Sequence, residues 1–349
     1  MRIISAALVI LSFPAAAIIE ITDNLALGGF GSSSWAKSDN ATSLMIHRGF
    51  VDESCYDCDT TFGVQLDYYY DALKASIQVV KRPQDGWDDP QIEWAYIGYD
   101  IDDFDIHVGT LRLPLFLTSE YYYVGHAYKM ARPPTEVYNS ILGITAFNGV
   151  DVSWNIDIND TQSLVVTPFY GFEDENEVNY SSSTTLNFSI SSMLGFNARL
   201  SSDNYRWNFA LLNAQYDQTN SVRFGEQVIV VQNDNQSLLL WSLGAEYEIG
   251  STLLTIEAQI NDYSSSWYSS IAYQHQSVTS YISYGTQYDA NEKIVSNSYL
   301  IGLRYDLYFN LSMNGELQYF DLTKDRGTFL SSPIKDEAFL YTVMLNFVF

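Results

Sequence analysis

Two cysteines and four histidines are the side chains best suited to redox, metal or nucleophilic chemistry. Cys55 and Cys58 form a Cys-x-x-Cys pair, which falls short of the four ligands of a structural zinc site. The first interpretation of this pair is therefore a disulfide local to its loop. The histidines stand in no Gly-x-Ser-x-Gly or His-Glu-x-x-His context, and they are His47, His107, His126 and His275. The sequence predicts no enzyme, no metal site and no organic cofactor.

Charged residues inside alternating apolar stretches are the second group with chemical potential. In 238–249, Leu239, Trp241 and Leu243 alternate with polar residues that include Glu246. Successive side chains of a strand point to opposite faces, so the charge lies opposite the apolar face. Arg199, Glu257 and Arg304 occupy equivalent positions in their own stretches. These patterns indicate strands with one apolar face and one polar, solvated face.

Sixteen such stretches predict an all-β chain, and an even strand number is typical of single-chain bacterial membrane barrels. The connections alternate between short turns, such as 71–72 and 102–103, and long loops, such as 37–60, 173–192 and 217–237. The predicted strands are 25–35, 61–70, 73–81, 92–101, 104–112, 149–158, 162–172, 193–200, 205–216, 238–249, 252–263, 267–274, 277–288, 297–307, 310–320 and 338–349.

The two ends and the composition favour a barrel in a membrane. A charged start, an apolar run and Ala15-Ala16-Ala17 predict a signal peptide over 1–17, leaving one barrel domain over 18–349. Aromatic residues make up 15% and charged residues only 17%, against roughly 25% charged in soluble domains. The net charge of -25 argues against nucleic acid as a partner. The last stretch alternates up to Phe349, which resembles the assembly signal of bacterial outer-membrane barrels.

Residues 113–148 form the longest irregular stretch and are rich in Tyr, Leu and Ile. Long structureless loops in compact domains are usually functional or disordered, and this composition is not that of a disordered tail. In a barrel of about sixteen strands, the lumen is the space available for it. We therefore expect this segment to pack inside the barrel.

The whole architecture resembles the sixteen-stranded porins of Gram-negative bacteria, in which a long third outer loop narrows the pore. The resemblance implies passive diffusion of small hydrophilic solutes and ions across the bacterial outer membrane, and assembly as a homotrimer. It also implies that opposite charges face each other at a constriction. Candidate residues for the constriction and lumen are Arg112, Glu120, Lys129, Arg132, Glu136, Lys74, Arg199, Glu246, Glu257 and Arg304.

Several alternatives stay open at this stage. The excess of carboxylates favours weak cation preference, whereas Arg112, Lys129 and Arg132 could form a local anion site. A substrate-specific channel and a structural or adhesive barrel with a closed lumen are the other functional hypotheses. Acidic outer loops could bind divalent cations beside lipopolysaccharide and the other outer-membrane lipids, or they could simply be a solvated surface.

Overall fold

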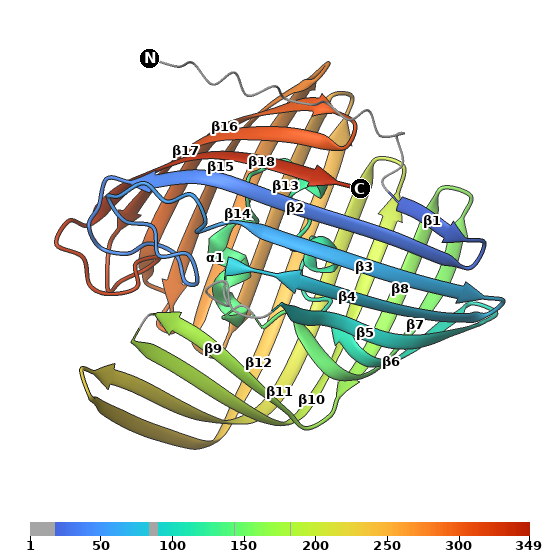
Figure 1. Cartoon of the computed structure of the whole chain (residues 1–349), viewed down its shortest axis with the longest axis horizontal. Helices are drawn as coiled ribbons and strands as arrows, with labels where there is room; N and C mark the ends of the chain where they lie inside the picture. Colours follow the sequence, from blue (N-terminus) through green and yellow to red (C-terminus); the bar gives the residue numbers. More distant parts are fainter. Residues whose placement is uncertain (1–17, 84–89, 143, 182) are drawn as a thin grey trace, which may run out of the picture.

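The computed structural model describes residues 18–83, 90–142, 144–181 and 183–349, so the predicted signal peptide lies outside the described residues. In this part of the chain, antiparallel strands close into one barrel (Figure 1). Sixteen strands, β2–β8 and β10–β18, form the wall, which confirms the predicted fold class. None of the helices in the described residues is long and apolar enough to cross a membrane.

The strands follow each other around the wall in sequence order. They are β1 Ile18–Thr22, β2 Leu25–Ser38, β3 Thr61–Tyr70, β4 Leu73–Lys81, β5 Gln91–Ile101, β6 Phe104–Arg112, β7 Ala146–Asn159, β8 Gln162–Gly171, β9 Asp174–Ser181, β10 Thr184–Ser202, β11 Tyr205–Phe224, β12 Gln227–Ile249, β13 Thr252–Asn261, β14 Ser264–His275, β15 Val278–Asp289, β16 Ile294–Tyr308, β17 Leu311–Leu322 and β18 Glu337–Val348.

Closure joins the last strand to the first wall strand. β18 pairs with β2 from Leu340 opposite Ser38 to Val348 opposite Phe30. β1 pairs with the start of β2, and β9 pairs with the outer half of β10. A closed barrel leaves no row of unpaired backbone groups at the depth of the hydrocarbon, which is what a bilayer requires.

All sixteen predicted strands are present, but two predicted loops are wrong. Residues 173–192 contain β9 and the start of β10, and residues 217–237 form the outer ends of β11 and β12. The ends of β11 and β12 form a hairpin that projects beyond the neighbouring strand β13. Most side chains on both faces of this hairpin are exposed. Because neither face is buried, the sequence there does not alternate between apolar and polar residues.

The two faces of the wall differ as the alternation predicts. Leu243, Ile256, Ile301 and Leu303 are more than half exposed on the outer face, whereas Ser242 is buried on the inner face. Such an apolar outer surface suits lipid tails, and the polar inner surface suits water. The inner face is where the charged candidates lie.

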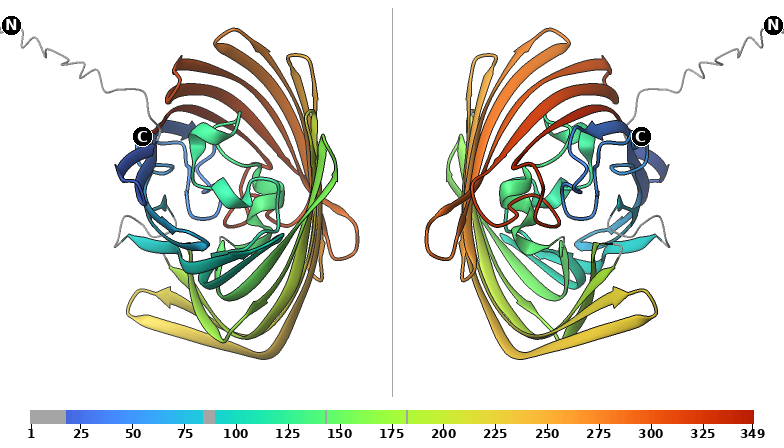
Figure 2. Two further views of the ribbon diagram at one scale, coloured as in Figure 1. Left: turned by 90° about the vertical axis from the view of Figure 1, so that its right-hand side faces the viewer. Right: turned by 90° about the vertical axis from the view of Figure 1, so that its left-hand side faces the viewer.

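Residues 113–145 connect β6 to β7 and include short helices: η2 Ser119–Tyr121, η3 Gly125–Ala127, α1 Thr135–Tyr138 and η4 Asn139–Ile141. Figure 2, which views the barrel from two opposite sides, draws this green segment within the ring of strands. We call it the β6–β7 segment. Its contacts with the inner face of the wall define the candidate site.

Candidate functional site

Glu257 anchors the start of the β6–β7 segment to β13. Its carboxylate is fully buried and accepts the Leu117 backbone N–H at 2.7 Å and the Tyr268 hydroxyl at 3.1 Å. Gly244 on the adjacent strand gives Leu117 room, since a Cβ there would lie 2.6 Å from the Leu117 side chain. Glu257 is therefore an inward-facing carboxylate that the segment covers.

Backbone carbonyls of the same stretch are held by amide side chains of the wall. Asn197 on β10 donates to the Pro114 oxygen at 2.7 Å, and Asn208 on β11 donates to the Leu115 oxygen at 3.1 Å. Both asparagines are buried. Buried backbone carbonyls need such partners, so this irregular stretch depends on the wall for its conformation.

Glu136 on α1 contacts the next three strands of the wall, β14 to β16. Its carboxylate accepts a hydrogen bond from Ser298, and its backbone oxygen accepts the Ser266 hydroxyl at 2.6 Å. Gly285 makes the approach possible, because a Cβ there would lie 2.7 Å from the Glu136 carboxyl carbon. Burial raises the pKa of Glu136. This candidate is also a packed anchor.

Arg304 and Lys129 differ in their surroundings. Arg304 is buried, donates to the His126 oxygen at 2.9 Å and to the Tyr128 oxygen at 2.5 Å, and pairs with Asp306 at 2.8 Å. Lys129 is partly exposed, and among the described residues no carboxylate lies within 4.0 Å of its amine. Arg304 thus fixes the backbone of the segment, while Lys129 keeps an available positive charge.

Arg132 joins the β6–β7 segment to the first outer loop (residues 39–60). Its guanidinium donates to the Asp59 carboxylate at 2.6 Å and to the Thr342 hydroxyl at 2.8 Å, and Arg48 pairs with the same carboxylate. Burial alone would raise the pKa of Asp59, but Arg132 and Arg48 hold it below its usual range. Glu316 lies 3.7 Å from Arg132, so two cations face two buried carboxylates.

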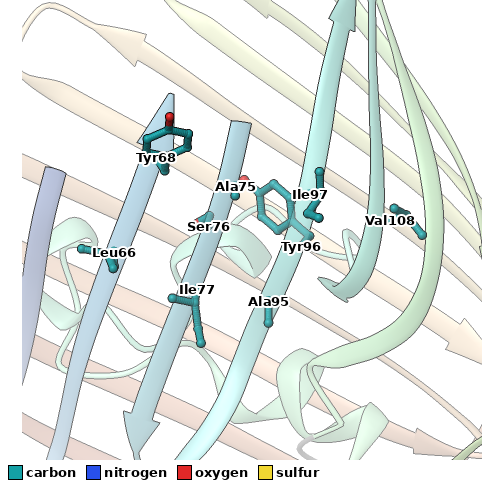
Figure 3. A pocket seen from close by; sticks show the side chains of 9 residues that line it. All are labelled: Leu66, Tyr68, Ala75, Ser76, Ile77, Ala95, Tyr96, Ile97 and Val108. Atoms are coloured by element: carbon teal, nitrogen blue, oxygen red, sulfur yellow. The ribbon is translucent and has the colours of Figure 1, made fainter. Parts of the chain in front are cut away.

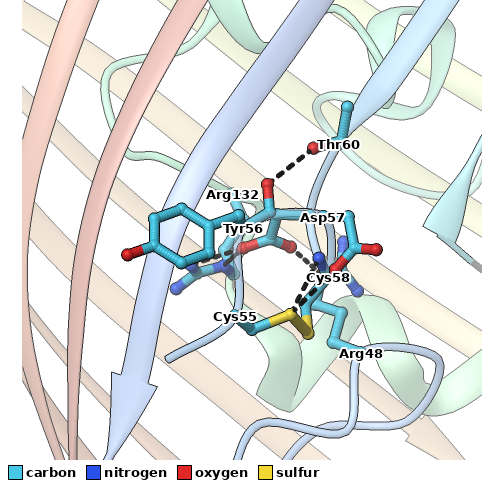
Figure 4. Close-up of a disulfide and its surroundings, with 8 residues drawn as sticks. Arg48, Cys55, Tyr56, Asp57, Cys58, Thr60 and Arg132 are labelled. Carbon is cyan, nitrogen blue, oxygen red and sulfur yellow. Dashed lines mark hydrogen bonds and ion pairs between the residues drawn. A yellow bond between two sulfur atoms is a disulfide. The ribbon is translucent and has the colours of Figure 1, made fainter. Parts of the chain in front are cut away.

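A disulfide joins Cys55 to Cys58 in the first outer loop, close to Arg48 and Arg132 (Figure 4). Asp57 lies beside these sulfurs, and the three residues are grouped closely enough to hold a metal ion. With both thiols bonded to each other, the group offers no thiolate ligand. The pair therefore constrains its loop and does not form a metal centre.

A cavity of about 260 Å³ lies between the β6–β7 segment and strands β5 to β8 and β10. Glu120 from the segment is 56% exposed and pairs with Arg199 from β10 at 2.7 Å. Arg112 also lines the cavity, and so do His107 and Asp151, which contact each other at 2.6 Å. Opposite charges from the segment and the wall thus meet at an open space.

The remaining candidates lie apart from this cavity. Glu246 on β12 pairs with Arg206 on β11 at 2.6 Å, near the short-turn end of the barrel. Lys74 on β4 pairs with Asp100 at 3.0 Å and Asp105 at 3.3 Å at the same end. These pairs face the exit of the barrel on the side of the short turns.

Several charged residues in these networks were not among the sequence candidates, and four of them show why. Glu93 accepts Arg112 at 2.6 Å and also pairs with Arg82. It lies on β5, where the apolar alternation is blurred. Asp59 lies in a loop, where no alternation exists, while Arg206 and Glu316 occupy polar positions of β11 and β17 that the pattern could have revealed.

The outer face also has a shallow depression of about 390 Å³ across β3–β6 (Figure 3). The small residues Ala75 and Ala95 lie between Ile77, Ile97 and Val108. Its apolar lining suits hydrocarbon, so it is not part of a path for hydrophilic solutes.

Comparison with known proteins places this geometry among outer-membrane barrels. No protein-family model and no curated protein matches the sequence. Among solved structures, an anion-selective porin from Comamonas acidovorans superposes with a TM-score of 0.62 at 12% identity, covering 93% of this chain and 99% of that chain.

Two other solved structures give similar values. Salmonella typhi OmpF in complex with daunomycin has a TM-score of 0.61 at 14% identity, covering 95% of this chain and 100% of that chain. In-vitro folded OmpT, an outer membrane protein of Vibrio cholerae, has a TM-score of 0.62 at 13% identity, covering 96% and 100%. The chain therefore has the sixteen-stranded fold of bacterial outer-membrane porins, as the sequence resemblance implied, and the predicted outer-membrane location agrees with all of these neighbours.

Proposed function

We propose that this protein is an outer-membrane channel that lets small hydrophilic solutes and ions diffuse passively, without catalysis. The observation that carries the proposal is the charged cavity inside a closed barrel, where Glu120 faces Arg199 and Arg112. Apolar residues cover the outer face of the same barrel. A polar passage surrounded by a lipid-compatible wall is the arrangement of a water-filled pore.

We propose that the β6–β7 segment folds into the lumen and forms the constriction of the channel. Its hydrogen bonds to Asn197, Glu257 and Arg304 support this role, because they fix it against the wall on several sides. The charges left at the open cavity, chiefly Glu120, Arg199 and Arg112, then set the local field. Rings of charge select ions by sign.

Single-channel conductance of the refolded protein in a planar bilayer is the direct test. Stable ohmic steps are expected, and a salt gradient gives the sign of the selectivity. A correctly closed barrel, verified by its heat-dependent electrophoretic migration, that produced no steps at any voltage would contradict the channel.

A closed structural barrel is the second candidate, and one observation favours it. Leu115, Phe116, Val137 and Tyr138 of the β6–β7 segment are buried in an apolar cluster with the inner wall. This cluster fills part of the barrel with side chains. Uptake of small sugars into liposomes separates the two, since a filled lumen admits none.

A substrate-specific channel would use the same cavity but saturate with one solute. Tyr123 and Trp94 place aromatic rings 5.2 Å and 5.3 Å from the Arg112 guanidinium, a surface on which a flat solute could stack. Saturation of the uptake rate by one solute class, and not by others of equal size, distinguishes this alternative from general diffusion.

A homotrimer embedded among outer-membrane lipids and lipopolysaccharide is the proposed assembly. One solved neighbour, Vibrio cholerae OmpT, is described in a trimer form. Light scattering of the detergent complex, corrected for bound detergent, gives the subunit number, and a strictly monomeric complex would contradict the trimer.

A further inference from the structure

A second, larger cavity of about 930 Å³ lies at the end of the barrel with the long loops. It is formed by the first outer loop, the β9–β10 hairpin, the outer end of β11 and the last outer loop (residues 323–336). Pro83 after β4 and Val228 on β12 also line it, so segments from five places in the sequence converge around one space. A solute approaching the proposed channel from this side meets this cavity before the constriction.

The lining is rich in hydroxyl groups. Half of its residues carry one, among them Tyr180, Ser181, Thr185 and Ser221. Hydroxyls donate and accept hydrogen bonds and rotate to suit the partner. Such a surface matches a ligand that itself carries many hydroxyls.

The charge of the cavity is opposite to that of the whole chain. Arg223 and Arg48 line it, Arg326 lies 5.1 Å from the Tyr180 ring, and no carboxylate is among its lining residues in the described part of the chain. Arg48 is already neutralised by Asp59, but neither Arg223 nor Arg326 has a carboxylate within 4.0 Å among the described residues. In a chain of net charge -25, this is a local site for an anion.

The neighbouring cavity shows that this segregation is local. A space of about 590 Å³ is lined by Asp174, Glu175 and Glu177 at the start of β9. The end of the same strand, Asn179–Ser181, lines the cationic cavity. One short strand therefore separates an acidic space from a basic one.

His47 helps to build the wall of the cavity. Its Nε2 lies 2.9 Å from the Leu142 oxygen. Burial lowers the pKa of His47 to about 4, so the ring is neutral at pH 7. The ring is held by the Leu142 and Asn179 backbone groups, so it fixes the first outer loop against the β6–β7 segment and β9 at the edge of the cavity.

We propose that this cavity binds an acidic oligosaccharide at the outer mouth of the barrel. Arg223 and Arg326 pair with its carboxylates, the Tyr180 ring packs against a sugar face, and the hydroxyl side chains contact its hydroxyls. As the capture site of a channel, it rests on the proposed function and names the solute class. The binding itself requires only the folded barrel.

The test is calorimetric titration of the refolded full chain in detergent with trigalacturonate. The matched ligand is the fully methyl-esterified trisaccharide, which keeps the shape and loses the charge. We expect trigalacturonate to bind at least about tenfold more tightly than the ester, because only the carboxylates can form charge-assisted hydrogen bonds with Arg223 and Arg326.

Variants locate the site. The double substitution Arg223→Gln with Arg326→Gln should weaken trigalacturonate binding about tenfold or more, and Tyr180→Ala should weaken both ligands. Lys293→Gln, which removes an exposed charge from another outer turn, is the matched control and should leave the affinity unchanged.

Equal binding of the acid and the ester, or equal loss of affinity in Lys293→Gln, would overturn the proposal, and the ester comparison needs no variant to fold. If trigalacturonate still binds in bilayers that contain lipopolysaccharide, the ligand is a free solute. If lipopolysaccharide competes with trigalacturonate there, the ligand is an acidic sugar of the membrane itself, which has the same chemistry. Ohmic conductance without trigalacturonate binding would contradict this binding site and support the channel. Binding without conductance would support the site and contradict the channel.

Discussion

Arg132 and Asp59 form a buried ion pair at 2.6 Å although they are 73 residues apart. Arg132 belongs to the β6–β7 segment and Asp59 to the first outer loop, so one contact holds two irregular segments together. Arg48 pairs with the same carboxylate from the loop side. The Asp59 carboxylate thus joins the outer loop to the β6–β7 segment, and the contact of His47 with the Leu142 oxygen at 2.9 Å joins them a second time.

Replacement of this carboxylate should destabilise both segments. Asp59→Asn leaves Arg48 and Arg132 buried without their counter-charge, and breaking a buried pair from one side typically costs about 3–5 kcal/mol. Urea unfolding and limited proteolysis of the outer loop measure the effect. Asp52→Asn, an exposed position in the same loop, is the control, and equal loss in both variants would contradict the buried pair.

The contribution of the pair should depend on pH with a defined sign. The pKa of Asp59 is held below its ordinary value of 3.8, so its stabilisation is fully present above that value. It is lost as the pH falls through the lower, folded-state pKa. Unfolding free energies of wild type and Asp59→Asn should therefore differ at pH 7 and converge only in strong acid. Convergence between pH 5 and 7 would show that another group controls the contact.

Ion selectivity should respond in opposite directions to the two partners at the cavity. Glu120→Gln removes an exposed negative charge and should shift the reversal potential toward anion preference, while Arg199→Gln should shift it toward cation preference. Glu292→Gln in an exposed outer turn is the matched charge control. Shifts of the same sign in both variants would exclude these residues from the ion path.

The disulfide should be dispensable for the barrel. It closes a loop of only three residues in sequence separation, for which the chain-entropy relation gives about 2 kcal/mol. The Cys55→Ser, Cys58→Ser double variant should fold and conduct like the wild type, with faster proteolysis confined to residues 39–60. Failure of this variant to form a heat-modifiable barrel would show that the loop guides closure.

The sequence was sufficient for the wall because burial on one face leaves a period of two. Trp241 and Leu243 alternate with Ser242 and Gly244 for that reason, and the structure has them on the expected faces. The hairpin beyond residue 216 escaped prediction because both of its faces are largely exposed, so its alternation carries no signal.

The candidate site was less predictable because burial by the β6–β7 segment cannot be read from strand periodicity. Glu257 and Arg304 do face inward, yet the segment covers both, so they hold backbone groups instead of contacting open lumen. Glu120 and Arg199 remain at a cavity because no apolar residue of the segment covers them. Whether an inward-facing charge is covered or open therefore depends on the path of residues 113–145.

The anchors of the β6–β7 segment have a consequence for the order of assembly. Asn197, Glu257, Glu316 and Thr342 all follow the segment in the chain, and Thr342 lies on the strand that closes the ring. The segment therefore cannot form all of these hydrogen bonds until β18 has paired with its neighbours. A barrel without its final strand would lack both the Thr342 contact of Arg132 and the pairing that closes the ring, so fixation of the segment and closure of the wall are one event.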